Sequence, residues 1–537
     1  MRNIHTAIEP LESRIAPASV FVFTDIDGDH VKITSSKGDL SAANVVNLSN
    51  AGQPAMAVGK PHELQQLNLD STFSGATITI TATPSTDLGG TTVQGDGFTN
   101  VGEINAQNVS LKSVAVHGDL AKILAGSTNT ATLGLGSLVV QSIGNFGTDK
   151  EIGATPDLVS RFQNGVGSIV VNGNVTGAFL HATATGLATT AKIGSITIKG
   201  SLIGATGDDS AGATDDTGEV AASDGIGAVK ILGSIIGGSG KQSGRVGTGP
   251  GGKIGSVAIG GNIVGGSNDN SGEVESGAGI GAVAVKGEIE GGSAFRSGLI
   301  HAKTLIASTS VGGSVIGGTF GETGGIESDG DLGTVKILGD LRGIDFTTTS
   351  SSPNFKHTGF VLALGRISGG VSVGGSLIAG METGGTLSFS GSIQAGHDIG
   401  AVTVLGSLVG NSATPVIISG VGQAVKTKTD VAIKSVAIGG GTDFAQIMGG
   451  YDTTGASADG DAQLGAIKIG SNMIASSIVS GIESTTPFDP NFGAADKVIA
   501  TNNTAAIHSA IASITVGGQI VGTVSPTTDS FGIEAQF

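Results

Sequence analysis

Three aspartates near the N-terminus have a spacing that could bind a cation. Asp25, Asp27 and Asp29 alternate in the sequence DIDGD, and Ca²⁺ prefers several carboxylate oxygens. An EF-hand loop beginning at Asp25 would need glycine at its sixth position and glutamate at its twelfth, where His30 and Ser36 stand. The sequence excludes an EF-hand and leaves two interpretations, a calcium site or a hairpin turn built from Asp and Gly. These aspartates are the metal-site hypothesis, and Ca²⁺ is the only cofactor it involves.

Two short motifs match the patterns of nucleotide-binding and hydrolase loops. Residues 247–253 read GTGPGGK, but a phosphate loop needs Ser or Thr next and then a helix, whereas Ile254 follows and begins a strand pattern. Residues 370–374 read GVSVG, but a nucleophile elbow needs a strand-to-helix turn, and Ser372 alternates with valines as in a strand. We predict a corner loop at the first motif and a solvent-facing strand residue at the second.

Acidic residues also gather in two longer loops, which contain Asp208, Asp209, Asp215, Asp216 and Glu219, and Asp452, Asp459 and Asp461. Such carboxylates could bind hard cations weakly. They also keep a glycine-rich, apolar surface soluble and prevent pairing at strand edges. We favour this second interpretation for both loops.

The composition argues against most enzyme classes and against nucleic-acid binding. The chain has no Cys, which removes disulfides, thiolate metal sites and cysteine catalysis. A net charge of −17 disfavours contact with phosphate backbones. Enzymes that cleave polysaccharides need clustered acids and aromatic side chains that stack on sugars, but aromatics make up only 4% of this chain. We predict no catalytic residues and no enzymatic activity.

Glycine and apolar residues together restrict the fold class. The 94 glycines in 537 residues follow no strict triplet period, which excludes collagen. Hydrophobic residues make up 38% of the chain, too many for simple disorder. No run of 18 apolar residues free of polar breaks occurs, so we predict no transmembrane helix.

An internal repeat determines the predicted fold. Residues 226–238, 254–266 and 280–292 read IGAVKILGSIIGG, IGSVAIGGNIVGG and IGAVAVKGEIEGG. The shared pattern is I-G-x-V-x-I-x-G-x-I-x-G, and it occurs 14 times. Its first positions are Leu111, Leu135, Val166, Ile193, Ile226, Ile254, Ile280, Ile306, Leu332, Ser368, Ile399, Ile433, Leu464 and Ile511.

Each repeat predicts three short strands with glycine-rich corners. Val229 and Ile231 alternate with Lys230, which is the period of a strand, and a second strand begins at Ile235 after Gly233. A third strand follows a variable loop, at Val246, Val274, Ile300 and Ile326. Because no such strand can bury its apolar face alone, we predict that equivalent strands stack in parallel. The fold class is all-β, a parallel β-solenoid of about 14 coils with a small N-terminal β cap.

The repeat divides the chain into four regions. Residues 1–19 form an N-terminal segment of the sorting type, and residues 20–100 form the β cap, which begins with a hairpin around IDGD. Residues 101–476 hold the solenoid repeats. Residues 477–537 hold a terminal coil with a long insertion, which we expect to cover the other end of the solenoid.

The N-terminal sequence IEPLESRIAPAS resembles the LEPR-XLL type of motif found at the start of many repeat-rich bacterial proteins. Leu11, Glu12 and Arg14 match the core of the motif, whereas Ala16 and Pro17 depart from it. The match covers about 12 residues and brings no catalytic residues with it. The resemblance implies export or display at the cell surface.

Together these features predict a non-enzymatic, structural or adhesin-like scaffold, extracellular or on the cell surface, that presents variable loops. Its expected partners are cell-surface or matrix polysaccharides or other surface proteins, and not nucleic acid. The alternative is a carbohydrate-binding or polysaccharide-degrading β-helix protein, with loops 205–225 and 343–366 as places where acids and cations could meet. A cytoskeletal filament is a third class, which the net charge and the long loops disfavour.

Overall fold

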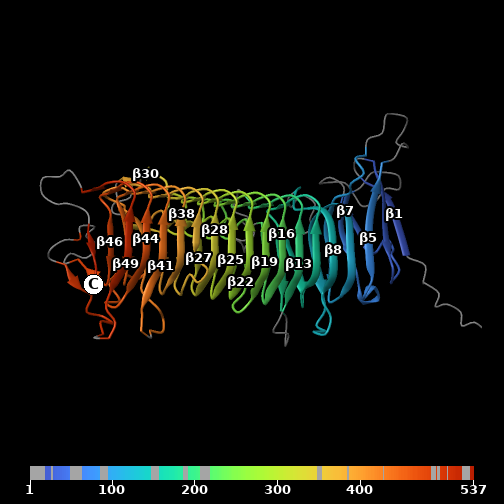
Figure 1. Cartoon of the computed structure of the whole chain (residues 1–537). Helices are drawn as coiled ribbons and strands as arrows, with labels where there is room; N and C mark the ends of the chain where they lie inside the picture. The colour runs from blue at the N-terminus through green and yellow to red at the C-terminus, as the bar shows by residue number, and fades with distance from the viewer. Residues whose placement is uncertain are drawn as a thin grey trace, which may run out of the picture.

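The computed structural model shows an elongated rod made almost entirely of β-strands, with coils stacked in chain order from one end to the other (Figure 1). One short 3₁₀ helix, η1 (Ser71–Phe73), interrupts the strands. The structure describes residues 19–25, 28–48, 63–84, 95–146, 157–184, 191–205, 218–347, 354–383, 386–426, 428–484, 492, 496–504, 506–522 and 532–536. Within these residues, no helix has the length and apolar character needed to cross a membrane.

The predicted solenoid is confirmed: each coil contributes one strand to each of three faces, and equivalent strands pair in parallel. The first face comprises β5 (Thr77–Thr83), β7 (Leu111–Gly126), β8 (Leu135–Ile143), β10 (Val166–Val171), β13 (Lys192–Ile198), β16 (Gly225–Ile231), β19 (Lys253–Ile259), β22 (Gly279–Val285), β25 (Leu305–Val311), β28 (Asp331–Ile337), β33 (Val371–Val373), β38 (Ile399–Val404), β41 (Val431–Ile438), β44 (Gln463–Ile469) and β49 (Ala510–Val516).

The second face is made of two-residue strands that follow a glycine-rich corner. They are β11 (Val175–Thr176), β14 (Leu202–Ile203), β17 (Ile235–Ile236), β20 (Ile263–Val264), β23 (Ile289–Glu290), β26 (Val315–Ile316), β29 (Leu341–Arg342), β34 (Leu377–Ile378), β39 (Leu408–Val409), β42 (Thr442–Asp443), β45 (Met473–Ile474) and β50 (Ile520–Val521).

The third face comes after the variable loop, as the repeat predicted. It comprises β4 (Glu63–Asn68), β6 (Val101–Gln107), the second half of β7, β9 (Val159–Gln163), β12 (Phe179–Thr183), β15 (Glu219–Ala222), β18 (Arg245–Thr248), β21 (Glu273–Ser276), β24 (Leu299–Ala302), β27 (Thr323–Ser328), β32 (Thr358–Ala363), β37 (Ser392–Ala395), β40 (Val416–Gly420), β43 (Ala445–Gly449), β46 (Ser477–Ser480) and β51 (Ile533–Glu534).

At one repeat the structure corrects the predicted register. The pattern placed the first position at Ser368, but Ile367 bridges Leu332 and Ile399 of the neighbouring coils. Val371 still pairs with the equivalent valine of the previous coil, so this strand carries one extra residue, as in a β-bulge. The apolar side chain of Ile367 occupies the inward position between Leu332 and Ile399. A serine at this position would place a polar hydroxyl group in the apolar core, which is unfavourable.

Inward-facing side chains of the three faces form one continuous core. Ile226, Ile254 and Ile280 stack in register on the first face and are at most 2% exposed. A single cluster of contacting apolar residues extends from Val31 in the N-terminal region to Ile478. Full burial of such a side chain contributes about 1.5–3 kcal/mol, so the repeated ladder stabilises the whole rod.

Close packing between coils requires glycine at particular corners. A Cβ atom on Gly281 would lie 2.0 Å from the carbonyl oxygen of Gly255 in the coil below. Gly272 begins the third-face turn with a φ of +62°, and its Cβ would lie 2.0 Å from the Val264 oxygen. Only glycine allows both the left-handed conformation and this approach without a clash.

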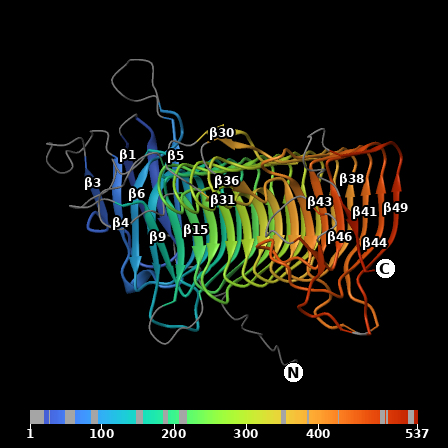
Figure 2. The same ribbon diagram turned by 90° about the vertical axis from the view of Figure 1, so that its left-hand side faces the viewer.

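The N-terminal end of the rod contains antiparallel strands. The predicted hairpin is present, with β1 (Ser19–Thr24) antiparallel to β2 (His30–Ser35). The strand β2 is antiparallel to β5, which in turn pairs in parallel with β7 of the solenoid. On the third face, β3 (Val45–Leu48) is antiparallel to β4 (Figure 2). The N-terminal strands therefore continue the faces of the solenoid, and the segment 1–18 lies outside the described residues.

At the C-terminal end, the last coil is β49, β50 and β51, each paired on one side with the coil before it. Ile520 and Val521 are 45% and 37% exposed, so the described residues leave this end of the ladder open to solvent. Within the described ranges, three two-stranded pairs lie outside the main sheet: β30 (Phe346–Thr347) with β35 (Glu382–Thr383), β31 (Asn354–Lys356) with β36 (Thr386–Ser388), and β47 (Ile482–Glu483) with β48 (Lys497–Val498).

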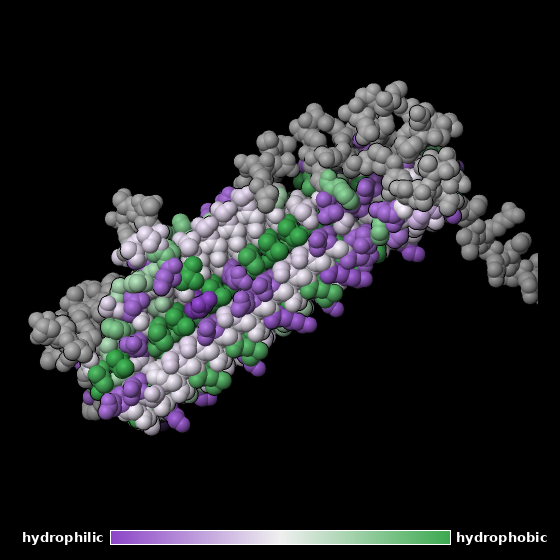
Figure 3. Space-filling model, turned by 90° about the horizontal axis from the view of Figure 1, so that it is seen from above, coloured by the Kyte–Doolittle hydropathy of each residue, from purple (hydrophilic) through white to green (hydrophobic). Residues whose placement is uncertain are grey.

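Stacking also orders the surface of the rod. Because equivalent positions of successive coils lie above one another, apolar and polar surface alternates in rows that run along the rod (Figure 3). A feature that occupies one position of the repeat therefore becomes a lengthwise row.

Candidate functional site

The aspartates near the N-terminus lie in the turn between β1 and β2. The Asp25 carboxylate accepts a hydrogen bond from the backbone N–H of Asp29 at 2.8 Å, and Asp29 accepts one from the Gly97 N–H at 2.7 Å. Both carboxylates are buried, while Asp27 lies outside the described residues. These contacts are those of the hairpin-turn interpretation, and the calcium hypothesis stays a prediction.

A hollow of about 490 Å³ lies beside that turn and is lined in part by Asp25, Asp96 and Asp119. The Asp119 carboxylate accepts hydrogen bonds from the Ser142 hydroxyl at 2.5 Å and from the Asn145 N–H at 3.2 Å. Burial raises the pKa of Asp119, and these hydrogen bonds oppose the rise. The Asp119 carboxylate therefore stabilises the corner after β8 through these hydrogen bonds.

Both short motifs have the structures that the sequence predicted. Residues 249–252 form the corner between β18 and β19, where the Thr248 hydroxyl donates to the Gly252 carbonyl oxygen at 3.0 Å. Ser372 lies in the middle of β33 and pairs with Lys336 and Thr403. Neither motif is followed by a helix.

The favoured interpretation of one acidic loop is wrong for two of its residues. Asp459 and Asp461 are buried and surround the Lys426 ammonium, at 2.7 and 3.5 Å, together with Asp430 at 2.7 Å. Burial raises the pKa of Asp459 to about 6, although the hydrogen bond from Lys426 opposes this. Asp452 is different, because it caps the exposed turn that contains Thr454. Asp459 and Asp461 therefore hold the loop that contains Lys426 against the rod, and they are not solvated surface residues.

Of the acidic residues in the other loop, only Glu219 lies within the described residues. Asp208, Asp209, Asp215 and Asp216 lie outside the described residues. Glu219 is described, and it is 2% exposed. It is not a solvated loop residue but begins β15 and belongs to a cluster that the sequence did not predict.

That cluster lies on the outer side of the third face. Inward residues such as Val246 alternate with outward residues, and each of β15, β18, β21, β24 and β27 has at least one ionisable outward residue. We call this set the charged segment, and its members are Glu219, Arg245, Glu273, Glu275, Arg296, His301, Lys303, Glu327 and Asp329.

Arg245 is the centre of the first half of the charged segment. Its Nη1 lies 2.7 Å from Glu219 Oε1 on the previous coil, and its Nε lies 3.5 Å from Glu273 Oε2 on the next. It also forms an ion pair with Glu275. Stacking in register places these residues side by side, because Glu219, Arg245 and Glu273 occupy one position of the repeat.

Arg296 reaches the charged segment from the turn before β24. It has a φ of 54°, and its guanidinium lies 3.9 Å from Glu273 and 3.7 Å from Glu327. Every coil here has a left-handed, non-glycine residue at this position, which we call the corner residue. The corner residues are Gln242, Asn270, Arg296, Glu322, His357 and Phe389.

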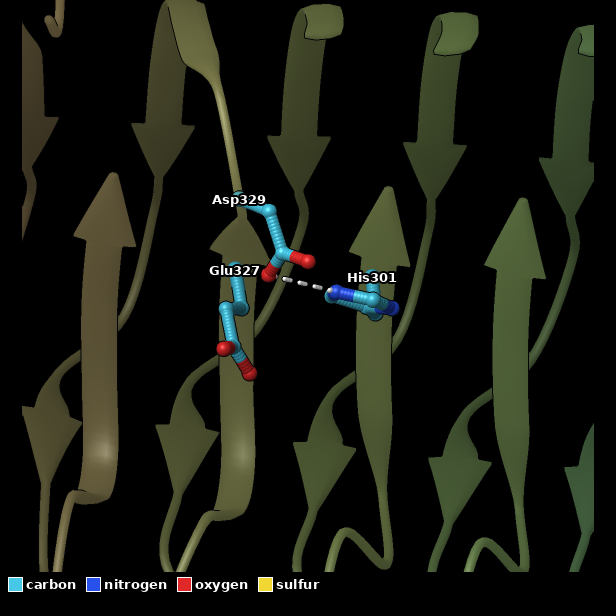
Figure 4. A group of neighbouring side chains, drawn as sticks. All are labelled: His301, Glu327 and Asp329. Carbon is cyan, nitrogen blue, oxygen red and sulfur yellow. Dashed lines mark hydrogen bonds and ion pairs between the residues drawn. The ribbon is translucent and has the colours of Figure 1, made fainter. Parts of the chain in front are cut away.

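His301 is the centre of the second half. It projects from β24 toward Asp329, which follows the end of β27, while Glu327 projects from β27 itself (Figure 4). His301 Nε2 lies 3.1 Å from Asp329 Oδ1, and its Nδ1 lies 3.6 Å from Glu275 Oε1. One ligand atom from each of His301, Glu327 and Asp329 lies within 4.8 Å of the other two.

Burial and pairing shift the pKa values in this segment in opposite directions. Burial raises the pKa of Glu273 to about 7, against the attraction of Arg245. The nearby His301 imidazole and the charge of Arg245 lower the pKa of Glu275 to about 2, against burial. Burial acts to lower the pKa of His301, but the neighbouring carboxylates of Glu275 and Asp329 outweigh burial and raise it. Neighbouring carboxyl groups therefore differ in charge state near neutral pH.

Farther along the same outer side, the charges are replaced by apolar side chains. We call this the apolar segment, and its buried members are Phe389, Ile417, Met448, Tyr451, Val479, Phe492 and Ile499. It borders a hollow of about 470 Å³, whose lining also includes Glu382 and Glu483. The Tyr451 hydroxyl donates a hydrogen bond to the Ile482 carbonyl oxygen at 2.7 Å.

The charged segment is not evident in the sequence, because its members are distant in the chain. The signal that could have found it lies in the third strands RVGT, EVES, LIHA and GIES, where charges flank the inward apolar residue. Aligning those strands by the repeat would have placed Glu275, His301 and Glu327 in one row.

Comparison with protein-family models, with curated proteins and with solved structures finds no match to this chain.

Proposed function

We propose that this protein is a non-enzymatic structural or adhesin-like scaffold that works outside the cell or on its surface. The observation that carries the proposal is the unbroken parallel ladder from β5 to β49, around which the loops and polar clusters are arranged. A stacked ladder of this kind gives a rigid rod whose corners and outward rows can differ from coil to coil. The resemblance of residues 8–19 to the LEPR-XLL type of motif supports the location.

The outer side of the third face is the surface through which such a scaffold would act. It holds both the charged segment and the apolar segment with its hollow. Binding residues commonly lie on the variable positions of a rigid repeat scaffold. The partners we propose are surface or matrix polysaccharides or other surface proteins.

Protease treatment of intact cells tests the location. Cells that produce the protein would be exposed to protease and probed with an antibody to this chain, with a cytoplasmic protein as the control. We expect the antibody signal to disappear while the control protein survives. A protease-resistant pool that fractionates with the cytoplasm would contradict surface display.

A second candidate function is carbohydrate binding in the hollow beside the apolar segment. The observation that favours it is the meeting of two carboxyl groups, Glu382 and Glu483, with Tyr451 and Phe492 in the lining of one hollow. Carboxylates and aromatic rings are the groups that sugar-binding sites use.

Titration with soluble polysaccharide fragments tests this candidate. Glu483→Gln should weaken binding of a fragment by tenfold or more, whereas Asp398→Asn, on the half-exposed Arg366 ion pair, should leave it unchanged. Equal affinity of the wild type and Glu483→Gln would reject the hollow as the binding site.

A further inference from the structure

We propose that His301, Glu327 and Asp329 form a binding site for a divalent transition-metal ion, for which Zn²⁺ is the probe. Zn²⁺ takes histidine nitrogen and carboxylate oxygen as ligands, in tetrahedral sites of three or four protein ligands. This site is independent of the proposed scaffold function, because it depends only on groups within the charged segment.

The positions of the three side chains favour a common ion. They come from two neighbouring coils, and their potential ligand atoms lie within 4.8 Å of one another. Zn–ligand bonds of about 2.0–2.2 Å hold such atoms about 3.3–3.5 Å apart. Asp329 Oδ1 already lies 3.1 Å from His301 Nε2, and rotation of the Glu327 side chain on β27 would have to bring its carboxylate to this separation.

Glu275 lies on the Nδ1 side of the imidazole. Its Oε1 is 3.6 Å from Nδ1, while Asp329 faces Nε2 at 3.1 Å on the other side of the ring. Metal-binding histidines generally have a carboxylate or carbonyl partner at the second ring nitrogen, and Glu275 is the carboxylate in position to move into hydrogen-bond distance of Nδ1 when Nε2 binds a metal. The fourth position of the ion would be left for water or another ligand.

The charged segment contains more carboxyl groups than permanent cations. Five carboxyl groups, those of Glu219, Glu273, Glu275, Glu327 and Asp329, form ion pairs with only three permanent cations, Arg245, Arg296 and Lys303.

Glu327 is a buried acid whose hydrogen bonding is incomplete, as is that of Glu273. It is 7% exposed, and its Oε2 accepts no hydrogen bond from any described residue. Its closest cation is Arg296, at 3.7 Å. Buried carboxylates are normally paired or bound to a metal, so a metal ion between Glu327 and Asp329 would supply the missing partner.

Lys303 is positioned to compete with the metal. Its ammonium pairs with Asp329, but its side chain is 65% exposed, so it can move into solvent when an ion binds. Removal of this charge should therefore strengthen metal binding, whereas removal of the Asp329 charge should weaken it.

Isothermal titration of the full chain with Zn²⁺, in a buffer that does not chelate metals, tests the site. We expect one Zn²⁺ ion per chain to bind at this site. Asp329→Asn should weaken binding at least tenfold, and Lys303→Met should strengthen it about threefold or more. Asp329 is partly exposed, so this variant is expected to fold, and circular dichroism would check both variants.

His181→Gln is the matched control. His181 lies on β12 at the same position of the repeat as Glu275 and His301, but its ring stacks on Phe179. This control should bind Zn²⁺ as the wild type does. The proposal is overturned if the wild type does not bind Zn²⁺, if Asp329→Asn binds with wild-type affinity, or if His181→Gln weakens binding as much as Asp329→Asn.

Discussion

The charged segment and the apolar segment occupy the same side of the same face, yet different interactions bury their outward residues. These are ion pairs in the charged segment and apolar packing in the apolar segment. In the charged segment one corner residue, Arg296, pairs with Glu273 of β21 and Glu327 of β27. In the apolar segment the corner residue is Phe389, which packs against Ile417 and its neighbours. The backbone conformation is the same, with φ near 55° at both corner residues.

His357 marks the boundary between the two segments. It is the corner residue of the coil between them, and its ring stacks on Phe389 at 5.1 Å while its Nε2 lies 3.1 Å from Gln394 Oε1. Burial lowers the pKa of His357 to about 4, so this residue is neutral at physiological pH. The row of charged side chains therefore ends at His357, which is uncharged and hydrogen-bonded.

The difference shows which positions of the repeat are free to vary. Inward positions are mostly apolar along the whole rod, because the coils share one core, and the exceptions such as Thr309 and Thr442 are small. Outward positions of the third face need only be complementary to the adjacent coils and to the corner residue. The chemistry of the molecule therefore lies in these outward rows.

The largest difference between the segments should come from Arg245→Met. The substitution leaves Glu219, Glu273 and Glu275 without their common partner, and breaking a buried ion pair costs about 3–5 kcal/mol. Urea denaturation would measure the loss. The control Arg366→Met removes a half-exposed ion pair and should have little effect. Equal stability of both variants would show that the charged segment does not depend on Arg245.

A smaller loss should come from Met448→Ala in the apolar segment. Removing a buried methionine side chain costs about 2–3 kcal/mol through lost burial and the cavity left behind. The cost should be the same at low and high salt, since no charge is involved, and Met448→Leu should recover most of it. A strong salt dependence in urea denaturation would contradict the apolar character of this segment.

The pH dependence of stability should distinguish the charged segment. Burial raises the pKa of Glu273 from 4.5 to about 7, so the folded state holds a proton that the unfolded chain releases. This contribution is fully present below pH 4.5 and is lost as the pH rises to about 7. Relative to wild type, Glu273→Gln should therefore gain about 1–3 kcal/mol between pH 5 and pH 8.

Asp398→Asn provides the control on another coil. Asp398 pairs with the half-exposed Arg366 and, among the described residues, forms no ion pair with the charged segment. Urea denaturation at several pH values should give Asp398→Asn the slope of the wild type between pH 5 and pH 8. A parallel slope for Glu273→Gln would contradict the raised pKa.

The smallest effect should come from Tyr451→Phe. This substitution keeps the ring in the apolar segment and removes the hydrogen bond from the hydroxyl to the Ile482 oxygen, which contributes about 1 kcal/mol. Hydrogen exchange of amides in β43 and β47 would measure the change. An effect as large as that of Met448→Ala would mean that the hydroxyl has a further role.

The sequence predicts the inward half of this structure well. Strand period and glycine corners place Val229, Ile231 and Ile235 correctly, because each depends only on its own repeat. The error at Ser368 arises because this strand has one extra residue before Val371. The repeat spacing counted back from Val371 gives Ser368, whereas the inward side chain is that of Ile367.

The outward chemistry depends on register between coils and could not be predicted from local pattern. Arg245 meets Glu219 across 26 residues and Glu275 across 30. Lys426 meets Asp459 across 33 residues, which turns an apparent surface acid into a buried one. Local composition describes such residues only as charged or as part of a loop.

Hydrogen exchange measured by mass spectrometry on the wild type, Arg245→Met and Met448→Ala tests the central claim, that the two segments are separate units on a common rod. In a repeat protein each coil contacts mainly its neighbours, so a local loss stays local. We expect Arg245→Met to increase exchange in β15 to β27, and Met448→Ala to increase it in β40 to β46. Exchange that rises along the whole rod in both variants would contradict the account.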